Sequence, residues 1–161
     1  MRKEEDYYQE IEDWLKVYLE EKYKGYSIET THKTARQYLD VVLRSMGIRC
    51  DVAIGLSIKI DVVGILRKGD EIKYVFVEVK EGELTLKDLG QLWGYTQLID
   101  PIESFLMSPK GIGGLDHLFN TLRREDLLKY GKKKEKLMKI VKWNETTKSI
   151  DLRKAIPRDQ F

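Results

Sequence analysis

Residues 58–95 of this 161-residue chain, IKIDVVGILRKGDEIKYVFVEVKEGELTLKDLGQLWGY, contain its clearest secondary-structure signals. Residues 59–66 and 73–80 are rich in β-branched and aromatic side chains, as in strands. Residues 67–71 between them contain a Gly-Asp pair that is typical of a hairpin turn. A helix is expected over residues 85–99, because Thr85 can cap its start and Asp100-Pro101 ends it. The stretch therefore predicts a β-hairpin followed by a helix.

Three charged residues stand at the ends of the two predicted strands. Asp61 lies near the start of the first strand, and Glu78 and Lys80 lie near the end of the second. Alternate residues of a strand share a face, so Glu78 and Lys80 point together and an antiparallel neighbour brings Asp61 alongside them. Two carboxyl groups in an apolar sheet are costly unless they pair or bind a cation, and such oxygen ligands suit Mg²⁺. The alternative is a Glu78–Lys80 ion pair, with Asp61 capping its strand.

An Asp in an apolar strand, a turn, and then hydrophobic-Glu-hydrophobic-Lys closing the next strand resembles the PD-(D/E)XK nuclease superfamily. Two features depart from the superfamily pattern. Ile60 precedes Asp61 where many members have Pro, and Gly55 lies too far upstream to be the Gly that RecB-type members carry shortly before the Asp.

The helix after the hairpin adds a second resemblance. Gln91 and Tyr95 stand in QLWGY, which is similar to the Q-x-x-x-Y motif of the RecB-type branch. Their spacing of four places them on one helical face. In that role they orient the catalytic Lys80 or contact a phosphate, and otherwise they are ordinary helix residues. Trp93 between them is expected to pack onto the sheet.

The resemblance implies an α/β fold with a restriction-endonuclease-like core, in which a mixed central β-sheet is flanked by α-helices. It also implies a Mg²⁺- or Mn²⁺-dependent nuclease that hydrolyses DNA phosphodiester bonds. In such a site Asp61, Glu78 and the carbonyl of Val79 hold the metal, which polarises the phosphate and activates a water. Lys80 positions that water or stabilises charge on the phosphate.

The first residues predict a helix over residues 4–23 with one apolar stripe. In the superfamily a helix before the sheet often supplies a Glu to the metal site. Glu12 fits that place, because apolar residues follow it at +3, +6 and +7 as in archaeal Holliday-junction resolvases, to which this part is similar. Glu10 is the alternative, and a surface role without function is open for both.

Basic residues gather in the last third of the chain. A run of this kind is most often a solvated loop, but beside a nuclease site it is a candidate phosphate contact. The glycine-rich residues 110–114 follow an expected parallel strand at 104–108 and lack the G-K-[ST] ending of a P-loop, so no nucleotide cofactor is expected. The candidate nucleic-acid contacts are Lys110, Arg123, Arg124, Lys132, Lys133 and Lys134.

Length and composition, 42% hydrophobic with a net charge of +2, predict one globular domain over residues 1–161. Residues 30–47 form a helical insertion, with a helix at 33–46, and a strand is expected at 48–54. A helix over 115–128 and a terminal hairpin complete the prediction. The single Cys50 excludes a disulfide framework or a thiolate zinc cluster.

No apolar run approaches the ~20 residues of a membrane span, and the charged N-terminus is unlike a signal peptide. We therefore expect an intracellular, cytoplasmic protein without membrane contact. DNA is the expected partner, and a homodimer is expected by analogy if the enzyme cuts both strands. The alternative function is a catalytically inactive nuclease-fold module that binds DNA or another protein.

Overall fold

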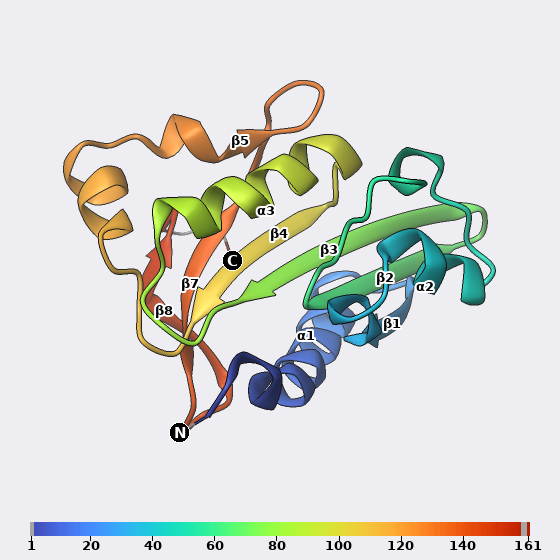
Figure 1. Cartoon of the computed structure of the whole chain (residues 1–161), viewed down its shortest axis with the longest axis horizontal. Coiled ribbons are helices and arrows are strands. Elements are labelled where there is room, and N and C mark those ends of the chain that lie inside the picture. The colour runs from blue at the N-terminus through green and yellow to red at the C-terminus, as the bar shows by residue number, and fades with distance from the viewer. Residues whose placement is uncertain (1, 159–160) are drawn as a thin grey trace.

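A computed structural model describes residues 2–158 and 161, which form an α/β fold around a six-stranded mixed sheet (Figure 1). The strand order is β1-β2-β3-β4-β7-β8. β3, β4 and β7 run parallel, and the other neighbouring pairs are antiparallel. The strands are β1 (Ser27–Thr31), β2 (Val62–Lys68), β3 (Glu71–Val79), β4 (Glu103–Ser108), β7 (Lys139–Asn144) and β8 (Ser149–Ile156), with a separate pair, β5 (Lys129–Tyr130) and β6 (Lys136–Leu137).

The β2–β3 hairpin is the predicted one and supplies the second and third strands of the sheet, with neighbours on both sides. Lys68 pairs with Glu71 across a two-residue turn, in which Gly69 has φ +60°. Glycine adopts this positive φ without steric cost, which explains the Gly-Asp signal in the sequence. Val62 and Val63 are both buried although they point to opposite faces. The hairpin is therefore covered on both sides.

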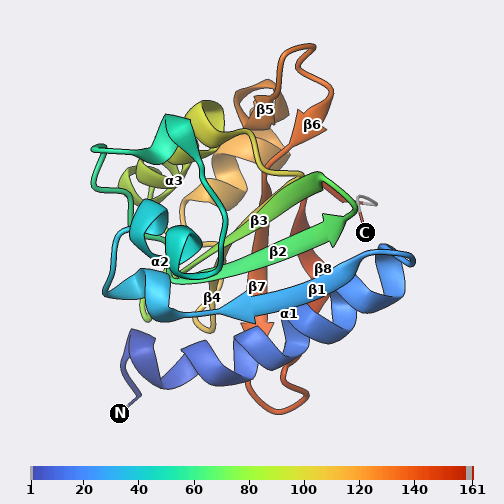
Figure 2. The same cartoon turned by 90° about the vertical axis from the view of Figure 1, so that its right-hand side faces the viewer.

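Helices cover the two faces of the sheet, as Figure 2 shows. One face packs against α1 (Tyr8–Lys22), which continues from the 3₁₀ turn η1 (Glu4–Tyr7), through Ile11, Leu15 and Leu19. The other face packs against α2 (Leu39–Ser45) and α3 (Leu86–Ile99). The predicted mixed sheet flanked by helices is confirmed, and it is consistent with a restriction-endonuclease-like α/β core.

The helix α3 begins and ends where the sequence predicts. Thr85 caps it, since the Asp88 N–H donates to Thr85 Oγ1 at 3.3 Å while the Thr85 N–H donates to Asp88 Oδ2 at 3.0 Å. Asp100 takes the left-handed conformation, with φ +58°, just before Pro101. β4 then runs parallel to β3, so the expected crossover at residues 104–108 is also confirmed.

Three local predictions were wrong. Residues 33–46 divide into the 3₁₀ turn η2 (Lys33–Ala35) and α2, so the insertion is less helical than expected. Residues 48–54 form no strand and contain only the turn η3 (Asp51–Ala53), because Ile48 and Ala53 pack over the face of the sheet. Residues 115–128 divide into a π-helical turn, η4 (His117–Thr121), and a 3₁₀ turn, η5 (Glu125–Leu128). Arg123 between them has φ +55°, which interrupts a helix.

Gly64 of β2 sets how closely α1 approaches the sheet. A Cβ atom at this position would lie 2.7 Å from Leu19 Cδ1 and 3.4 Å from Leu15 Cδ2. We expect Gly64→Val to lower the free energy of unfolding by about 1–3 kcal/mol, because its branched side chain overpacks this contact. The measurement is urea denaturation followed by circular dichroism.

Gly94→Ala is the matched control. Gly94 lies on the exposed side of α3 and a Cβ there meets nothing within 4 Å. This substitution should stabilise the protein by about 0.5–1 kcal/mol, because alanine loses less backbone entropy in a helix. If Gly64→Val were as stable as the wild type, the packing described for α1 would be incorrect.

Candidate active site

Asp61 and Glu78 lie opposite one another where β2 begins and β3 ends. Val62 pairs with Val77, so the antiparallel register places the preceding residue, Asp61, across from Glu78. The Asp61 N–H donates to Glu78 Oε1 at 3.3 Å, and the Val79 N–H donates to Asp61 Oδ2 at 2.8 Å. Each carboxyl group thus accepts a hydrogen bond from the backbone of the opposite segment. The hairpin itself brings the two groups together.

Tyr8, in the first turn of α1, fixes the remaining oxygen of Asp61. Its hydroxyl donates to Asp61 Oδ1 at 2.9 Å. Burial and the neighbouring charge of Asp61 raise the pKa of Tyr8 above its ordinary value, so the phenol stays a neutral donor. Both oxygens of Asp61 therefore have a fixed donor. Sequence reasoning assigned Tyr8 no role, because Tyr7, its neighbour, fits the buried stripe of the helix.

Glu78 is almost completely buried, with 4% of its surface exposed, whereas Asp61 is half-buried. Burial and the adjacent Asp61 raise the pKa of Glu78 to about 10, although the charge of Lys80 acts in the opposite direction. Without a cation, the pair therefore favours holding one proton over two ionised carboxylates. Such an adjacent pair is a site where a bound cation displaces a proton and removes the repulsion.

Lys80 and Glu4 complete the charged group. Lys80 follows β3 directly and is half-buried, and its backbone N–H donates to the Met107 carbonyl at 3.0 Å. Burial raises the pKa of Glu4, Lys80 opposes the shift, and Asp61 adds to it. Glu4, in η1, therefore senses both Lys80 and Asp61. Its spacing of four from Tyr8 is the sequence signal that could have identified it.

The two glutamates that the sequence favoured are held elsewhere. Glu12 Oε2 lies 3.6 Å from His32 Nδ1 and accepts from Gln9 Nε2 at 3.1 Å. Glu10 accepts from Trp143 Nε1 at 3.1 Å and forms an ion pair with Arg2, also at 3.1 Å. In the described residues, neither glutamate contacts the carboxyl pair.

The protein ligands that this site offers a metal are few. Across residues 2–158 and 161, no group of three or more His, Cys, Asp or Glu side chains is arranged to hold one metal ion. Asp61 and Glu78 are thus the two carboxyl groups that the hairpin brings together, and any further ligands are backbone carbonyls and water. Mg²⁺ is compatible with such a set, because it usually keeps several waters and is often bound by one or two carboxylates.

Gln91 and Tyr95 lie one turn apart on α3. Gln91 is exposed, and Tyr95 is half-buried against the core between α3 and the sheet. Within the described part of the chain, no hydrogen bond joins either residue to Lys80. Trp93 does not pack onto the sheet as expected but is 44% exposed. The buried stripe of α3 consists of Leu89, Leu92 and Thr96, and Trp93 lies beside that stripe.

The candidate phosphate contacts divide into two places. Lys110 is exposed in the loop after β4, and its N–H donates to Ser108 Oγ at 3.1 Å. Ser108 in turn donates to the Gly82 carbonyl at 2.5 Å, which ties this loop to the segment that follows Lys80. The residues near α3 and in the β5–β6 loop are exposed: Arg123, Arg124, Lys132, Lys133 and Lys134.

A second buried charge cluster lies near the start of β4, and the sequence did not reveal it. Glu103 accepts from Tyr18 at 2.8 Å and Tyr23 at 2.6 Å, and it forms a buried ion pair with Lys139. Burial acts to raise the pKa of Glu103, but Lys139 and the surrounding donors hold it below its ordinary value. Glu103 is thus a satisfied anion, in contrast to Glu78. Its partners indicate a structural role.

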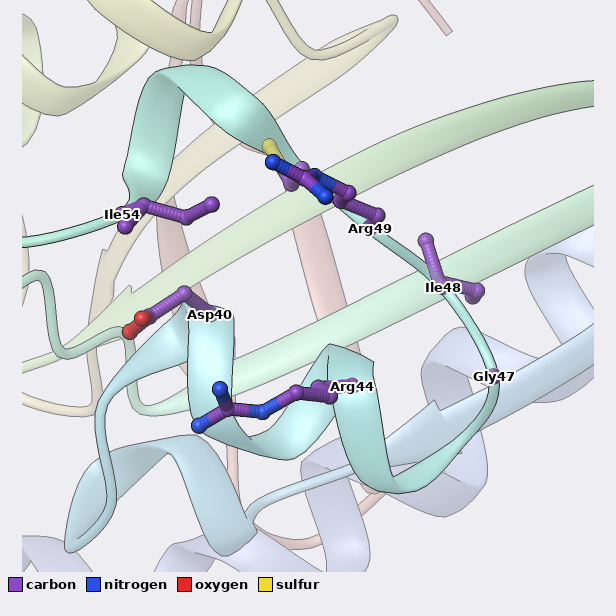
Figure 3. A pocket seen from close by; sticks show the side chains of 7 residues that line it. Asp40, Arg44, Gly47, Ile48, Arg49 and Ile54 are labelled. Carbon is purple, nitrogen blue, oxygen red and sulfur yellow. The ribbon is translucent and has the colours of Figure 1, made fainter.

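A separate hollow of about 420 Å³ lies between α2 and the loop that follows it, lined by Arg44, Arg49 and Cys50 among others (Figure 3). Arg49 is engaged by Asp51 at 2.5 Å, and Asp40 adds a negative charge to the lining. Charges of both signs therefore border this hollow, and nothing in its lining selects a ligand.

Comparisons with protein-family models, curated proteins and solved structures each returned no match. Membership of the nuclease superfamily therefore rests on the residues described above and stays a prediction. Among the described residues, no helix combines the length and apolar character needed to cross a bilayer.

The raised pKa of Glu78 predicts a pH-dependent stability. Its pKa is about 10 in the folded protein against an ordinary value of 4.5, so between these values the folded state holds a proton that the unfolded state has lost. The free energy of unfolding therefore falls as pH rises, by up to about 1.4 kcal/mol per pH unit. Glu78→Gln should remove this slope and melt at a higher temperature than the wild type at alkaline pH.

Thermal melts in EDTA from about pH 6 to about pH 9 measure the effect. Glu20→Gln, at an exposed glutamate of α1, serves as the control and should follow the wild type. Parallel pH profiles for the wild type and Glu78→Gln would mean that Glu78 is ionised in the folded protein.

Proposed function

We propose that this protein is a divalent-metal-dependent nuclease of the PD-(D/E)XK type that hydrolyses DNA phosphodiester bonds. The observation that supports it most is the carboxyl pair of Asp61 and Glu78, with Lys80 two residues beyond Glu78. Each of the two carboxyl groups accepts a hydrogen bond from a backbone N–H of the opposite segment. Among the described residues, no ion pair reaches the buried Glu78, whereas the structural glutamate Glu103 pairs with Lys139. A group left in this state is a candidate ligand or catalyst rather than a structural element.

Asp61 and Glu78 would hold Mg²⁺ or Mn²⁺, with the carbonyl of Val79 as the further ligand that the resemblance implies. The bound cation supplies positive charge to the phosphate and lowers the pKa of a water. When the cation binds, the proton held by the carboxyl pair would pass to solvent. Tyr8 and the Val79 N–H hold Asp61 in place, which keeps the carboxyl pair rigid.

Lys80 is the positive charge that the chain itself adds to the site. Its charge acts on Glu78, whose pKa it lowers, and it is half-buried, so solvent screens its charge incompletely. The ammonium group can donate to a phosphate oxygen or to the attacking water. Such fixed donors stabilise the charge that develops in the transition state. Lys110, on the adjoining loop, is the proposed contact for a neighbouring phosphate.

A second function is supported by a different observation. Glu12, the glutamate that the resemblance favoured for the metal site, does not reach the carboxyl pair in the described residues, since it is held by His32 and Gln9. A module that binds DNA or another protein without cleaving it fits this incomplete ligand set. A homodimer remains a prediction from analogy.

Cleavage of labelled single-stranded, duplex, flap and four-way-junction DNA in Mg²⁺, Mn²⁺ or EDTA tests the proposal. We expect metal-dependent cutting by the wild type and a loss of about 10²–10³-fold in Lys80→Ala, because one fixed donor to the reacting phosphate is removed. Asp61→Ala should lose at least as much.

Lys73→Ala is the matched control, because Lys73 lies on β3 at the end remote from the carboxyl pair and pairs with Glu71 at 3.2 Å. It should cut as the wild type does. Absence of cutting by the wild type on every substrate, with DNA binding equal in all four proteins, would reject the nuclease and leave the binding module.

A further inference from the structure

A groove of about 490 Å³ runs between α3 and the segment that contains η5 and β5. This segment passes alongside α3 in Figure 1, where it is drawn in orange. Leu86, Leu89 and Trp93 of α3 and Leu127 of η5 give the groove an apolar lining, and Lys129 and Lys134 also border it.

Trp93 is the unusual residue of this groove. It is 44% exposed, whereas Trp143 is 1% exposed and Trp14 is half-buried. Leu86 and Leu127 beside it are also exposed, at 64% and 36%. Exposed apolar side chains that gather in one place, rather than singly, mark an interaction site. An indole with one open face is a surface on which a planar ring can stack.

The charge around the groove is positive. Asp126, the acidic residue in the lining, is neutralised by Arg124, which donates to its two oxygens at 3.0 and 3.1 Å. Among the described residues, neither Lys129 nor Lys134 forms an ion pair, and the Lys134 ammonium instead donates to the Gln97 amide oxygen at 3.3 Å. Two lysines therefore remain available to an anion that enters the groove.

The groove begins close to the candidate active site in sequence. Leu86, which lines it, is the first residue of α3, and Lys80 lies six residues earlier, at the end of β3. A nucleic-acid strand that runs from the carboxyl pair along α3 would pass Leu86 first and would reach Trp93 within two helical turns of it.

We propose that this groove binds single-stranded nucleic acid, with a base stacked on Trp93 and backbone phosphates at Lys129 and Lys134. An aromatic platform beside a positive rim is how proteins bind single strands without sequence preference. A duplex keeps its bases stacked on one another, so it cannot offer one to Trp93. The proposal names the strand form that the proposed nuclease would hold, and in that respect it rests on the proposed function.

Fluorescence anisotropy of labelled oligothymidylate in EDTA tests the groove without cleavage. We expect Trp93→Ala to raise the Kd about tenfold, the loss of one stacked base, and Trp93→Phe to retain most of the affinity. Leu98→Ala is the control, since Leu98 is 46% exposed on the same helix but lies outside the groove. Its affinity should equal that of the wild type.

The double variant Lys129→Glu, Lys134→Glu tests whether the two lysines contact phosphates. It should bind oligothymidylate more weakly than the wild type and with a smaller salt dependence. Lys16→Glu, at an exposed position of α1 on the opposite side of the sheet, should have little effect. A duplex of equal length should bind more weakly and with the same Kd to the wild type and Trp93→Ala.

The groove proposal and the nuclease proposal can be rejected independently of one another. A Trp93-dependent affinity for oligothymidylate without any cleavage by the wild type would retain the groove and reject the nuclease. Equal affinity of Trp93→Ala and the wild type would overturn the groove proposal, whatever the cleavage result. Displacement of the oligonucleotide by polyglutamate at equal charge concentration would also overturn it, because a merely basic surface would then account for binding.

Discussion

The pairing of β2 with β3 is the constraint on which both the fold and the candidate site depend. Valines on both faces of the hairpin pack against helices, so a register slip of one residue would move each of them to the opposite face and disrupt both packing layers. The same register places Asp61 opposite Glu78. The hydrogen bonds from the Asp61 and Val79 N–H groups then hold the carboxyl groups together. The packing of the hairpin thus determines which carboxyl groups meet where β2 begins and β3 ends.

The two buried glutamates of the sheet, Glu103 and Glu78, lie in opposite electrostatic environments. Glu103 has two ammonium groups, those of Lys139 and Lys22, and two phenols within hydrogen-bond distance, and its pKa is lowered. Glu78 faces another carboxyl group, and its pKa is raised. The environment of Glu103 stabilises the folded state at neutral pH, whereas the environment of Glu78 destabilises it. Functional sites commonly carry such a stability cost, because the groups are arranged for a ligand rather than for the empty protein.

Much of the framework was predictable from the sequence because it depends on local signals. Alternating and continuous apolar runs predicted β2, β3 and β4, and Thr85 with Asp100-Pro101 predicted the limits of α3. Residues 48–54 were wrongly predicted as a strand, because their alternation also suits a loop that packs over a sheet face. The break at Arg123 depends on one backbone conformation that its residue type does not favour.

The composition of the site was harder to predict than the hairpin. Asp61, Glu78 and Lys80 follow from strand periodicity, but Tyr8 and Glu4 depend on the axial position of α1 along the sheet. That position depends on tertiary packing, of which the contact of Leu15 and Leu19 with Gly64 is one part, and not on any motif. Helical spacing alone places Glu4, Tyr8 and Glu12 on one face, and only the tertiary structure separates them. The exposure of Trp93 likewise could not be predicted from the sequence, because it depends on the groove that the tertiary structure forms beside α3.

Calorimetric titration of Mn²⁺ into the wild type, in buffers of different ionisation enthalpy at neutral pH, tests whether Asp61 and Glu78 bind a metal. We expect one saturable site, with about one proton released for each ion bound, because the cation displaces the proton that the carboxyl pair holds. Asp61→Asn should lose both the binding and the proton release. Absence of saturable binding, or binding that is unchanged in Asp61→Asn, would contradict the assignment of the carboxyl pair as a metal site.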